Sequence, residues 1–169
     1  MFDYHNVSFW ITDGTLLGYY RENDFINHDH DMDIAVFIDD WKDEILVDLK
    51  RKEFKLLYIY GDKSCGLEYT LLKNNIRTDI FFFYKENNYY WHAAWDISKI
   101  KSFLNMIKYL YEPFKLKEIK FKNINLKIPE NTEKYIIQKY GKNWKTPIKK
   151  WRWNYDPKNY KKTNIYYLK

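Results

Sequence analysis

The densest set of chemically active side chains is an acidic run that leads into an apolar stretch. It comprises Asn27-His28-Asp29-His30-Asp31-Met32-Asp33-Ile34. Along an extended strand residues i and i+2 share a face, so Asp31 and Asp33 are predicted to present two carboxylates side by side. Such like charges raise each other's pKa unless a cation lies between them. Carboxylate oxygens suit Mg²⁺ and Mn²⁺, and we therefore predict a site for Mg²⁺ (or Mn²⁺), with Asp29 as a further ligand or a supporting group.

A third carboxylate, Asp79, lies in a later apolar run. The segment is Arg77-Thr78-Asp79-Ile80-Phe81-Phe82-Phe83. A charge inside such a run is costly unless it is paired or binds a metal. The simpler alternative is that Asp79 faces solvent at the end of a strand. We favour the metal-site interpretation, because two acidic strands side by side in one sheet would bring Asp79 to Asp31 and Asp33.

An anion-binding element precedes the acidic run. A tight turn at Asp13-Gly14 that leads into a helix would present backbone N–H groups to a phosphate, and the Thr15 hydroxyl would add to them. Arg21, one or two helical turns on, would reach the same anion with two N–H groups. An ordinary helix cap at Thr15 is the alternative interpretation. The short distance in sequence to the acidic run favours phosphate binding by Gly14, Thr15 and Arg21.

Two histidines, His28 and His30, interleave with these acids, which raises the question of a His-Asp phosphohydrolase. That chemistry places its ligands on helices and uses further histidines far away in the sequence. Here an apolar strand follows, and only His5 and His92 remain. We predict that His28 and His30 support the acidic ligands or are exposed. Zinc bound by these histidines is a minor alternative.

Apolar spacing and turn residues predict the elements that must position these groups. Strands are expected over 8–12, 31–37, 54–60, 67–72 and 76–84, with a later hairpin of 119–121 and 125–128. Helices are expected over 15–21, 39–52, 99–111 and 130–140, the last ended by Gly141. Residues 85–98 and 142–169 show no clear period. This order of elements predicts an α+β or mixed α/β protein.

The length of 169 residues fits a single domain spanning 1–169. Charge is unevenly distributed along it. Residues 1–98 carry 10 Lys and Arg against 18 Asp and Glu, whereas residues 99–169 carry 19 against 5. A solvated basic face is the more common cause of such a pattern. The functional alternative is an acidic half that holds cations beside a basic half that holds an anion, such as a phosphate-rich substrate, an anionic polymer or nucleic acid.

A single cysteine, Cys65, excludes an intrachain disulfide and a thiolate zinc cluster. The first residues lack the basic start and long apolar run of a signal peptide, and no stretch approaches 18 apolar residues. We therefore predict a cytoplasmic protein that does not span a membrane.

Three segments resemble the LicD and fukutin family. The first is Trp10-Ile-Thr-Asp-Gly-Thr-Leu-Leu-Gly-Tyr-Tyr-Arg21, followed by Phe25-Ile26 and Asp29-His-Asp-Met-Asp-Ile34. The second is Asp79-Ile-Phe, which resembles the third acidic strand of the family. The last is Phe121 to Pro129 with Asn131 to Gly141, Trp144 and Pro147, which resembles its late hairpin and "Pro, helix, Tyr-Gly" element. The chain departs from the family in having Asn27-His28 where Pro-Trp usually precedes the first Asp.

This resemblance implies a nucleotidyltransferase (DNA polymerase β-like) fold, with a mixed central sheet flanked by helices. Its core would span about 8–147, and 148–169 would form a basic aromatic extension. It also implies transfer of a phospho-alcohol, such as phosphocholine or ribitol phosphate, from a CDP-linked donor to a sugar or glycan hydroxyl with release of CMP. Asp31 and Asp33 would be metal ligands, and Asp79 a third ligand or the proton acceptor. Gly14, Thr15 and Arg21 would bind phosphate.

Two alternatives stay open at this point. A true nucleotidyltransferase with the same metal site would transfer a nucleotide from a nucleoside triphosphate and release pyrophosphate. A non-catalytic module would bind anionic glycan or nucleic acid through the basic C-terminal half. The intact set of Asp31, Asp33 and Asp79 argues against the second alternative, which makes nucleic acid an improbable partner.

Overall fold

The computed structural model describes residues 1–97 and 103–168. Its helices are α1 (Asp13–Glu22), α2 (Asp43–Arg51) and α3 (Thr132–Tyr140), with 3₁₀ turns η1 (Asp3–His5) and η2 (Ile38–Asp40). Its strands are β1 (Phe9–Ile11), β2 (Asp31–Phe37), β3 (Lys55–Asp62), β4 (Cys65–Lys73), β5 (Ile76–Lys85), β6 (Tyr90–Ile97), β7 (Phe103–Tyr111), β8 (Leu116–Phe121), β9 (Ile124–Pro129) and β10 (Tyr160–Leu168).

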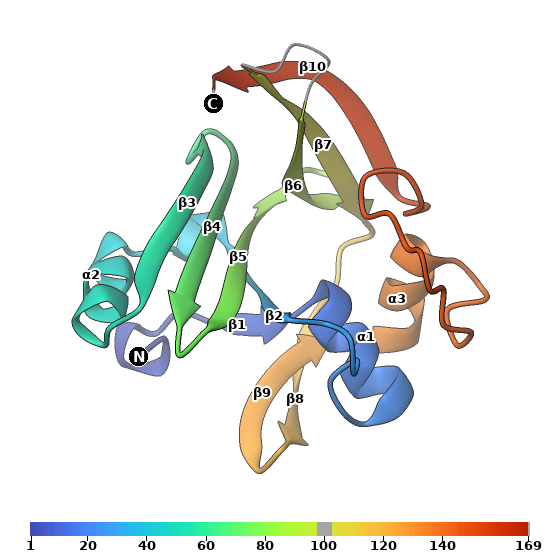
Figure 1. Cartoon of the computed structure of the whole chain (residues 1–169), viewed down its shortest axis with the longest axis horizontal. Coiled ribbons are helices and arrows are strands. Elements are labelled where there is room, and N and C mark those ends of the chain that lie inside the picture. The colour runs from blue at the N-terminus through green and yellow to red at the C-terminus, as the bar shows by residue number, and fades with distance from the viewer. Residues whose placement is uncertain (98–102, 169) are drawn as a thin grey trace.

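One mixed sheet organises the chain. Strands follow the order β1-β2-β5-β6-β7-β10, and β4 pairs with both β3 and β5. The pairing of β2 with β5 is parallel, and the other pairings of this sheet are antiparallel. Strand β5 changes partners along its length, from β2 and β4 to β6 at Tyr84 and Lys85. The β6-β7-β10 part therefore folds away from β3 and β4 (Figure 1). The predicted α+β class is confirmed.

The two faces of the β2-β5-β4 part differ in character. Helix α2 contributes Ile45 and Leu49 to the core on one face, and Trp41, just before this helix, lies 4.9 Å from Phe82 and 5.8 Å from Tyr69 between ring centroids. Because side chains alternate along a strand, the residues between these apolar positions point to the other face. Asp33, Asp79 and Thr70 belong to that second face, which α2 does not cover.

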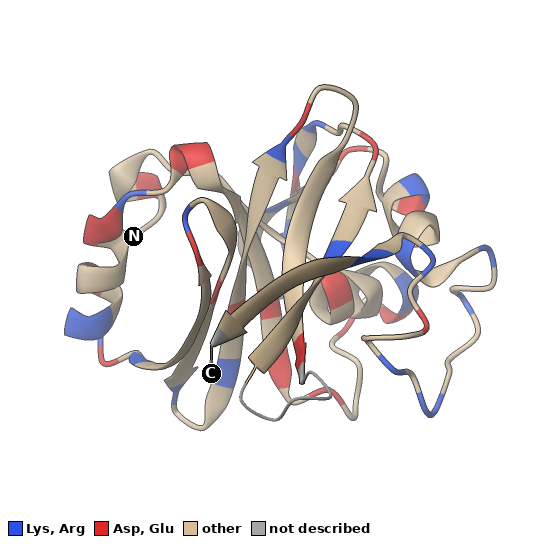
Figure 2. Ribbon diagram, turned by 90° about the horizontal axis from the view of Figure 1, so that it is seen from above, with Lys and Arg blue, Asp and Glu red and all other residues tan. Residues whose placement is uncertain are grey.

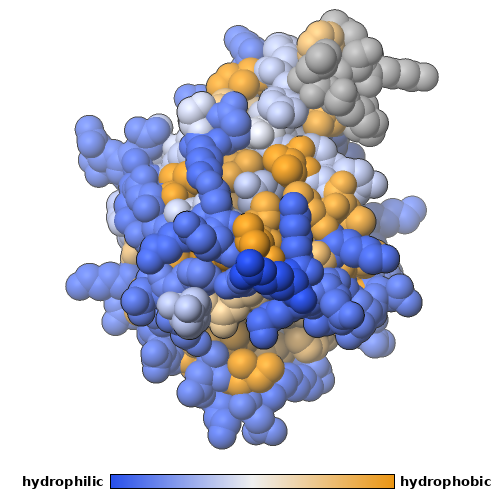
Figure 3. Space-filling model, turned by 90° about the vertical axis from the view of Figure 1, so that its left-hand side faces the viewer, coloured by the Kyte–Doolittle hydropathy of each residue, from blue (hydrophilic) through white to orange (hydrophobic). Residues whose placement is uncertain are grey.

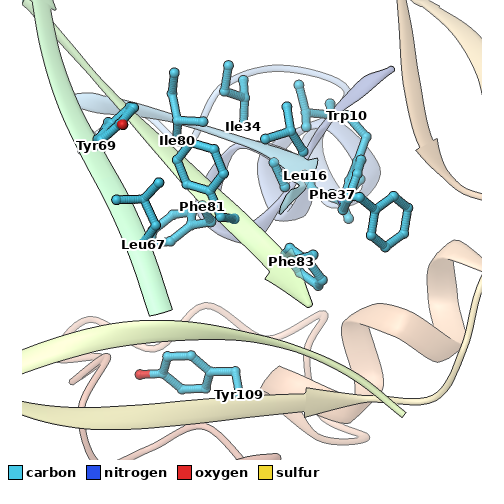
Figure 4. Packing of buried hydrophobic residues seen from close by; sticks show 14 of the residues in the cluster. Trp10, Leu16, Ile34, Phe37, Leu67, Tyr69, Ile80, Phe81, Phe83 and Tyr109 are labelled. Atoms are coloured by element: carbon cyan, nitrogen blue, oxygen red, sulfur yellow. The ribbon is translucent and has the colours of Figure 1, made fainter. Parts of the chain in front are cut away.

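A continuous apolar core holds these layers together. Figure 4 shows Leu16 of α1 among Trp10, Ile34 and Ile80, with Tyr109 of β7 on a separate strand. Trp10 is fully buried and lies 5.1 Å from the Phe83 ring and 5.6 Å from the Phe114 ring. Much of the aromatic content of the sequence therefore belongs to the core.

The second half of the chain differs from the sequence prediction. The helix expected over 99–111 is wrong, because 103–111 form β7, while 99–102 lie outside the described residues. Leu104, Met106, Tyr109 and Tyr111 are buried at mostly alternate positions, a period typical of a strand. The unassigned segments 85–98 and 142–169 contribute β6 and β10.

Two helix starts also differ. Helix α1 begins at Asp13 with Thr12 before it, so Thr15 is not the helix cap, and the predicted turn at Asp13-Gly14 is the first turn of the helix. Helix α2 begins at Asp43, because the chain after β2 first forms the 3₁₀ turn η2. The strands predicted over 67–72 and 76–84, the hairpin at 119–128 and the stop at Gly141 are confirmed.

The edge strand β3 is largely exposed. Leu57, Tyr58 and Ile59 are 41%, 54% and 47% accessible. Figure 3 shows the side of the molecule that carries α2 and β3, where hydrophobic residues are divided by hydrophilic ones. Within the described part of the chain, no helix is long and apolar enough to cross a membrane. The predicted cytoplasmic location stays a prediction.

Candidate active site

The strand register brings the acids of two segments together. In the parallel pair of β2 and β5, Asp33 lies opposite Asp79, and Asp31 lies opposite Arg77. On the other side of β5, Thr70 of β4 pairs with Asp79 and donates its hydroxyl to Asp79 Oδ1 at 2.6 Å. The three predicted carboxylates, Asp31, Asp33 and Asp79, therefore share one face of the sheet and line one cavity.

The start of α1 is tied directly to this acidic strand. The Gly14 N–H donates to Asp33 Oδ2 at 2.7 Å, and the Asp33 N–H donates to Thr15 Oγ1 at 2.8 Å. A side chain at position 14 would overlap Asp29 Oδ2 and would lie 3.1 Å from Asp33 Oδ2. Glycine is therefore needed there for the close approach of the carboxylates to the helix. The Thr15 hydroxyl is buried and positions β2, so it does not face the cavity.

Arg77 is a cation of the site that sequence reasoning missed. Its guanidinium pairs with Asp31 Oδ2 and lies 3.3 Å from Asp79 Oδ2. Its place in the sequence could have indicated this role, because Arg77 precedes Asp79 by two residues on the same strand and so shares its face. Arg77 partly neutralises Asp31 and Asp79, whereas among the described residues the Asp33 side chain accepts a hydrogen bond only from the Gly14 N–H.

The acids of the cavity are held in an unfavourable electrostatic environment. Burial, with the charges of Asp13 and Asp31, raises the pKa of Asp33 well above its usual value. Burial and the neighbouring Asp31 raise the pKa of Asp29 to about 7. Burial also raises the pKa of Asp79, against the opposing effects of Thr70 and Arg77. Such a cluster favours a bound cation, which would stabilise the ionised carboxylates.

The donor set fits a hard divalent cation in kind, because it consists of carboxylate oxygens on adjacent strands. Within the described residues, however, no group of three His, Cys, Asp or Glu side chains is already arranged to hold an ion. Asp31 and Asp79 are both turned toward Arg77. Binding a metal ion would therefore require these side chains to turn from Arg77 toward Asp33.

A second buried carboxylate, Asp13, has its counter-charge built in. Lys139 of α3 places Nζ 2.5 Å from Asp13 Oδ1, and His92 of β6 places Nε2 3.8 Å from Asp13 Oδ2. Burial alone would raise the pKa of Asp13, but Lys139 and His92 hold it below its usual value. Burial in turn lowers the pKa of His92 to about 4. The Lys139 ammonium also lies 4.4 Å from the centre of the Tyr109 ring.

Glu68 of β4 is a further acid of the cavity that sequence reasoning missed. It is 9% accessible, and its Oε2 has no hydrogen-bond partner among the described residues. Burial and the charges of Asp79, Asp33 and Asp13 raise its pKa well above the usual value. A lone acid in the apolar run Leu67-Glu68-Tyr69-Thr70-Leu71 was the available signal, of the same kind as that for Asp79.

Two adjoining cavities open on this site. The first, here called the carboxylate cavity, measures about 430 Å³ and contains all the acids described above. The second, the Arg21 cavity, measures about 290 Å³ and lies against the end of α1 and the segment that follows α3. Gly14, Asp29, Tyr140 and Trp151 line both. Basic positions recur along the loops between α3 and β10 (Figure 2).

The predicted site residues are thus divided between the two cavities. Asp31, Asp33 and Asp79 line the carboxylate cavity, and Asp29 and Gly14 stand at the boundary. Arg21 lines the second cavity and is not in contact with the acids of β2 and β5. His28 and His30 are exposed, and His28 lines the Arg21 cavity. The predicted roles in metal and phosphate binding stay predictions.

Comparisons with known proteins agree with the resemblance noted in the sequence. The family model described as LicD/FKTN/FKRP, nucleotidyltransferase domain, matches residues 6–131. The mouse protein named ribitol-5-phosphate transferase FKTN is 35% identical over 161 residues, which is 95% of this chain and 34% of that protein. The human protein of the same name is 33% identical over the same shares. An uncharacterized protein of Rickettsia typhi, RT0683, is 29% identical over 72% of this chain and 36% of its own length.

The chain spans about a third of the length of these curated relatives. Among solved structures, the lincosamide antibiotic adenylyltransferase LnuA, with lincomycin bound, aligns with a TM-score of 0.47 and 12% identity, covering 79% of this chain and 76% of that chain. A likeness at that level carries no argument about fold or mechanism.

Proposed function

This chain belongs to the LicD/FKTN/FKRP family, and from that membership and its acidic cavity we propose that it is a phosphotransferase with a nucleotidyltransferase fold. The proposed reaction transfers a phospho-alcohol from a CDP-linked donor to a sugar or glycan hydroxyl and releases CMP. Ribitol phosphate is the first alcohol to test, because the mouse and human relatives are named ribitol-5-phosphate transferases.

A single observation carries this proposal. Asp33 and Asp79 lie in register on adjacent parallel strands, with the Gly14 N–H 2.7 Å from Asp33 Oδ2. Buried like charges are costly, and a fold gains no stability from placing them together without a cation. Their retention around a cavity is therefore best explained by a substrate complex that supplies the missing positive charge.

Each residue has a role in the proposed reaction. Asp31 and Asp33 would hold Mg²⁺ (or Mn²⁺), and Asp79 would add a third ligand or take the proton of the acceptor. When bound, the metal ion supplies positive charge that offsets the charge developing on the transferred phosphoryl group. The Arg77 guanidinium is a donor that lines this cavity and would steady phosphate oxygens, whereas the Gly14 N–H holds the Asp33 carboxylate in place. The buried Thr15 hydroxyl positions Asp33 and so acts indirectly.

The chemical step balances without a further reactant. The acceptor hydroxyl oxygen forms a bond to the phosphorus that carries the alcohol, and the bond from that phosphorus to the CMP oxygen breaks. The hydroxyl proton passes to a carboxylate of the cavity, and CMP leaves as the anion. Raised pKa values suit these carboxylates to accept a proton near neutral pH.

The decisive experiment incubates the protein with a panel of CDP-alcohols and nucleoside triphosphates, with Mg²⁺ or Mn²⁺, in the presence of sugar acceptors. Release of CMP together with a phosphorylated acceptor is expected. Release of pyrophosphate instead would identify a nucleotidyltransferase. Salt-sensitive binding of an anionic polymer, with no metal dependence and no turnover, would overturn the enzymatic assignment.

A further inference from the structure

The two cavities differ sharply in charge, although they share a wall. The carboxylate cavity is lined by six acids, Asp13, Asp29, Asp31, Asp33, Glu68 and Asp79. Against them stand only Arg77 and Lys139 among the residues that line it. The Arg21 cavity has the opposite balance, because Arg21 and Lys149 line it with Asp29 alone as an acid. In the metal-free protein an anionic ligand is therefore favoured in the Arg21 cavity and opposed in the other.

The walls of the Arg21 cavity also suit a flat apolar ring. Trp144 and Trp151 line it together with Leu17, Ile26 and Pro147. Aromatic faces of this kind stack on nucleobases without regard to sequence. Its volume of about 290 Å³ matches a compact ligand, near the lower end of the range of about 300–1,000 Å³ found for small-molecule sites.

Arg21 is held in place with N–H donors to spare. Its Nε and Nη2 donate to Glu22 Oε1 at 3.1 and 2.6 Å, and its Nη1 donates to the Trp144 carbonyl at 3.4 Å. These contacts use three of the five N–H groups of a guanidinium, so two remain for a ligand. Lys149, from the segment that follows α3, is exposed and lines the same cavity, so its flexible ammonium can approach the same anion.

Displacement at phosphorus places the attacking and leaving oxygens on opposite sides of the reacting centre. Gly14 and Asp29 stand where the two cavities meet, so a phosphorus atom beside them has one cavity on either side. We propose that the Arg21 cavity binds the nucleoside monophosphate part of the donor and that the carboxylate cavity receives the acceptor sugar. This assignment rests on the proposed transfer reaction and adds to it the place of each substrate.

The carboxylate cavity suits the acceptor for a separate reason. Tyr58, Tyr60, Trp95 and Trp153 line it, and aromatic rings of this kind can pack against the C–H surface of a sugar. Neutral hydroxyl groups can donate to the carboxylates that do not hold the metal ion, whereas the CMP dianion finds cationic partners, Arg21 and Lys149, in the Arg21 cavity. The attacking hydroxyl thus arrives on the side that holds its proton acceptor, and the charged CMP departs on the basic side.

Titration with CMP in the presence of Mg²⁺, followed by calorimetry, tests this assignment. Arg21→Met and Lys149→Glu should each weaken CMP binding by about tenfold, the loss expected for one charge-assisted contact, and should change cytidine binding much less. Lys149 is exposed, so its variant is not at risk of misfolding. Tyr58→Ala, in the carboxylate cavity, should leave CMP affinity unchanged and raise KM for the acceptor.

The reverse pattern, with CMP binding weakened by Tyr58→Ala and insensitive to both charge variants, would overturn the assignment. It would leave the proposed reaction intact if CMP is still released from a CDP-alcohol. Absence of CMP binding in the wild-type protein would contradict the assignment as well. If, in addition, no donor of the panel yields CMP, the proposed function itself has failed.

Discussion

Two buried acids lie next to Gly14, Asp13 before it in the sequence and Asp33 in contact with its N–H, and their electrostatic environments are opposite. Asp13 is paired with Lys139 at 2.5 Å and is approached by His92, and its pKa is held below the usual value. Asp33 is buried to the same degree, with 8% of its surface accessible, yet it faces other acids and its pKa is raised well above the usual value. Within residues 1–97 and 103–168, the fold thus pairs Asp13 with a cation and gives Asp33 no ion pair of its own.

This difference separates a structural ion pair from a binding site. A buried charge that only stabilises the fold must carry its partner with it, as Asp13 does. A charge kept for a ligand costs stability in the free protein and recovers it when the ligand binds. Variants of the two acids and of their surroundings should therefore affect folding and activity in different proportions.

The largest effect is expected for Asp33→Asn. We expect transfer to fall by at least about a thousandfold, because the variant removes the central charge of the predicted metal site. Stability measured by urea unfolding without metal should be unchanged or higher, since one of several repelling charges is removed while an amide oxygen can still accept the Gly14 N–H. Asp40→Asn, an exposed acid just beyond β2, is the control. Full activity in Asp33→Asn would eliminate the proposed site.

Lys139→Met should chiefly lower stability. It leaves Asp13 buried without its ion-pair partner, which costs about 3–5 kcal/mol in the free energy of unfolding. The matched control is Lys134→Met on the same helix, whose partner Glu112 is exposed and whose loss should cost at most about 1 kcal/mol. Adding Asp13→Asn to Lys139→Met should restore much of the loss. Equal losses of unfolding free energy in the two lysine variants would contradict a stabilising role for the buried pair of Lys139 and Asp13.

Stabilisation by Mg²⁺ should increase with pH. The pKa of Asp29 is raised to about 7, and those of Asp33 and Asp79 are raised as well, so protons compete with the metal at lower pH. We expect the rise in Tm produced by Mg²⁺ to grow from about pH 5 to about pH 8 and to disappear in Asp33→Asn. Without metal, the raised pKa values of these acids have a second consequence. Ionisation is less favourable in the folded state than in the unfolded state, so these acids lower the stability of the folded protein as the pH rises above about 4.

His92 changes the pH dependence of stability in the opposite direction. Because its pKa is lowered to about 4, the folded state gains stability as the pH rises from about 4 toward the usual pKa of histidine. Its effect is present with and without metal, so it cancels when the two melting curves are subtracted. A gain in Tm that is independent of pH would mean that the ion binds elsewhere.

A smaller and more selective effect is expected for Gly14→Ala. The added methyl group would overlap Asp29 Oδ2, and this flexible side chain can turn away. Mg²⁺ affinity should therefore fall by about tenfold, as for the loss of a supporting group, with little change in unfolding free energy. In Gly18→Ala the new Cβ would meet the Asp24 carbonyl at 2.7 Å and the Ile26 nitrogen at 2.9 Å, which are backbone atoms. That control should cost about 1–3 kcal/mol of stability without altering metal affinity.

Local patterns were sufficient for the first half of the molecule. The alternation in Asp31-Met32-Asp33 and in Arg77-Thr78-Asp79 predicted strands whose acids share a face, and the structure places β2 and β5 side by side in that register. Local patterns were insufficient for β7, where a run of apolar residues predicts a helix but forms a strand. A short apolar run fits the helical period and the strand period equally well when the turn residues on either side of it are weak signals.

The sequence by itself therefore determined which acids lie on one face of the sheet, because strand parity is a property of each local segment. Only the tertiary structure decided which charges meet. It brought Lys139 to Asp13 and placed the segment after α3 against Arg21, through packing between segments far apart in the chain. Such contacts depend on how whole elements pack, and no local period encodes them.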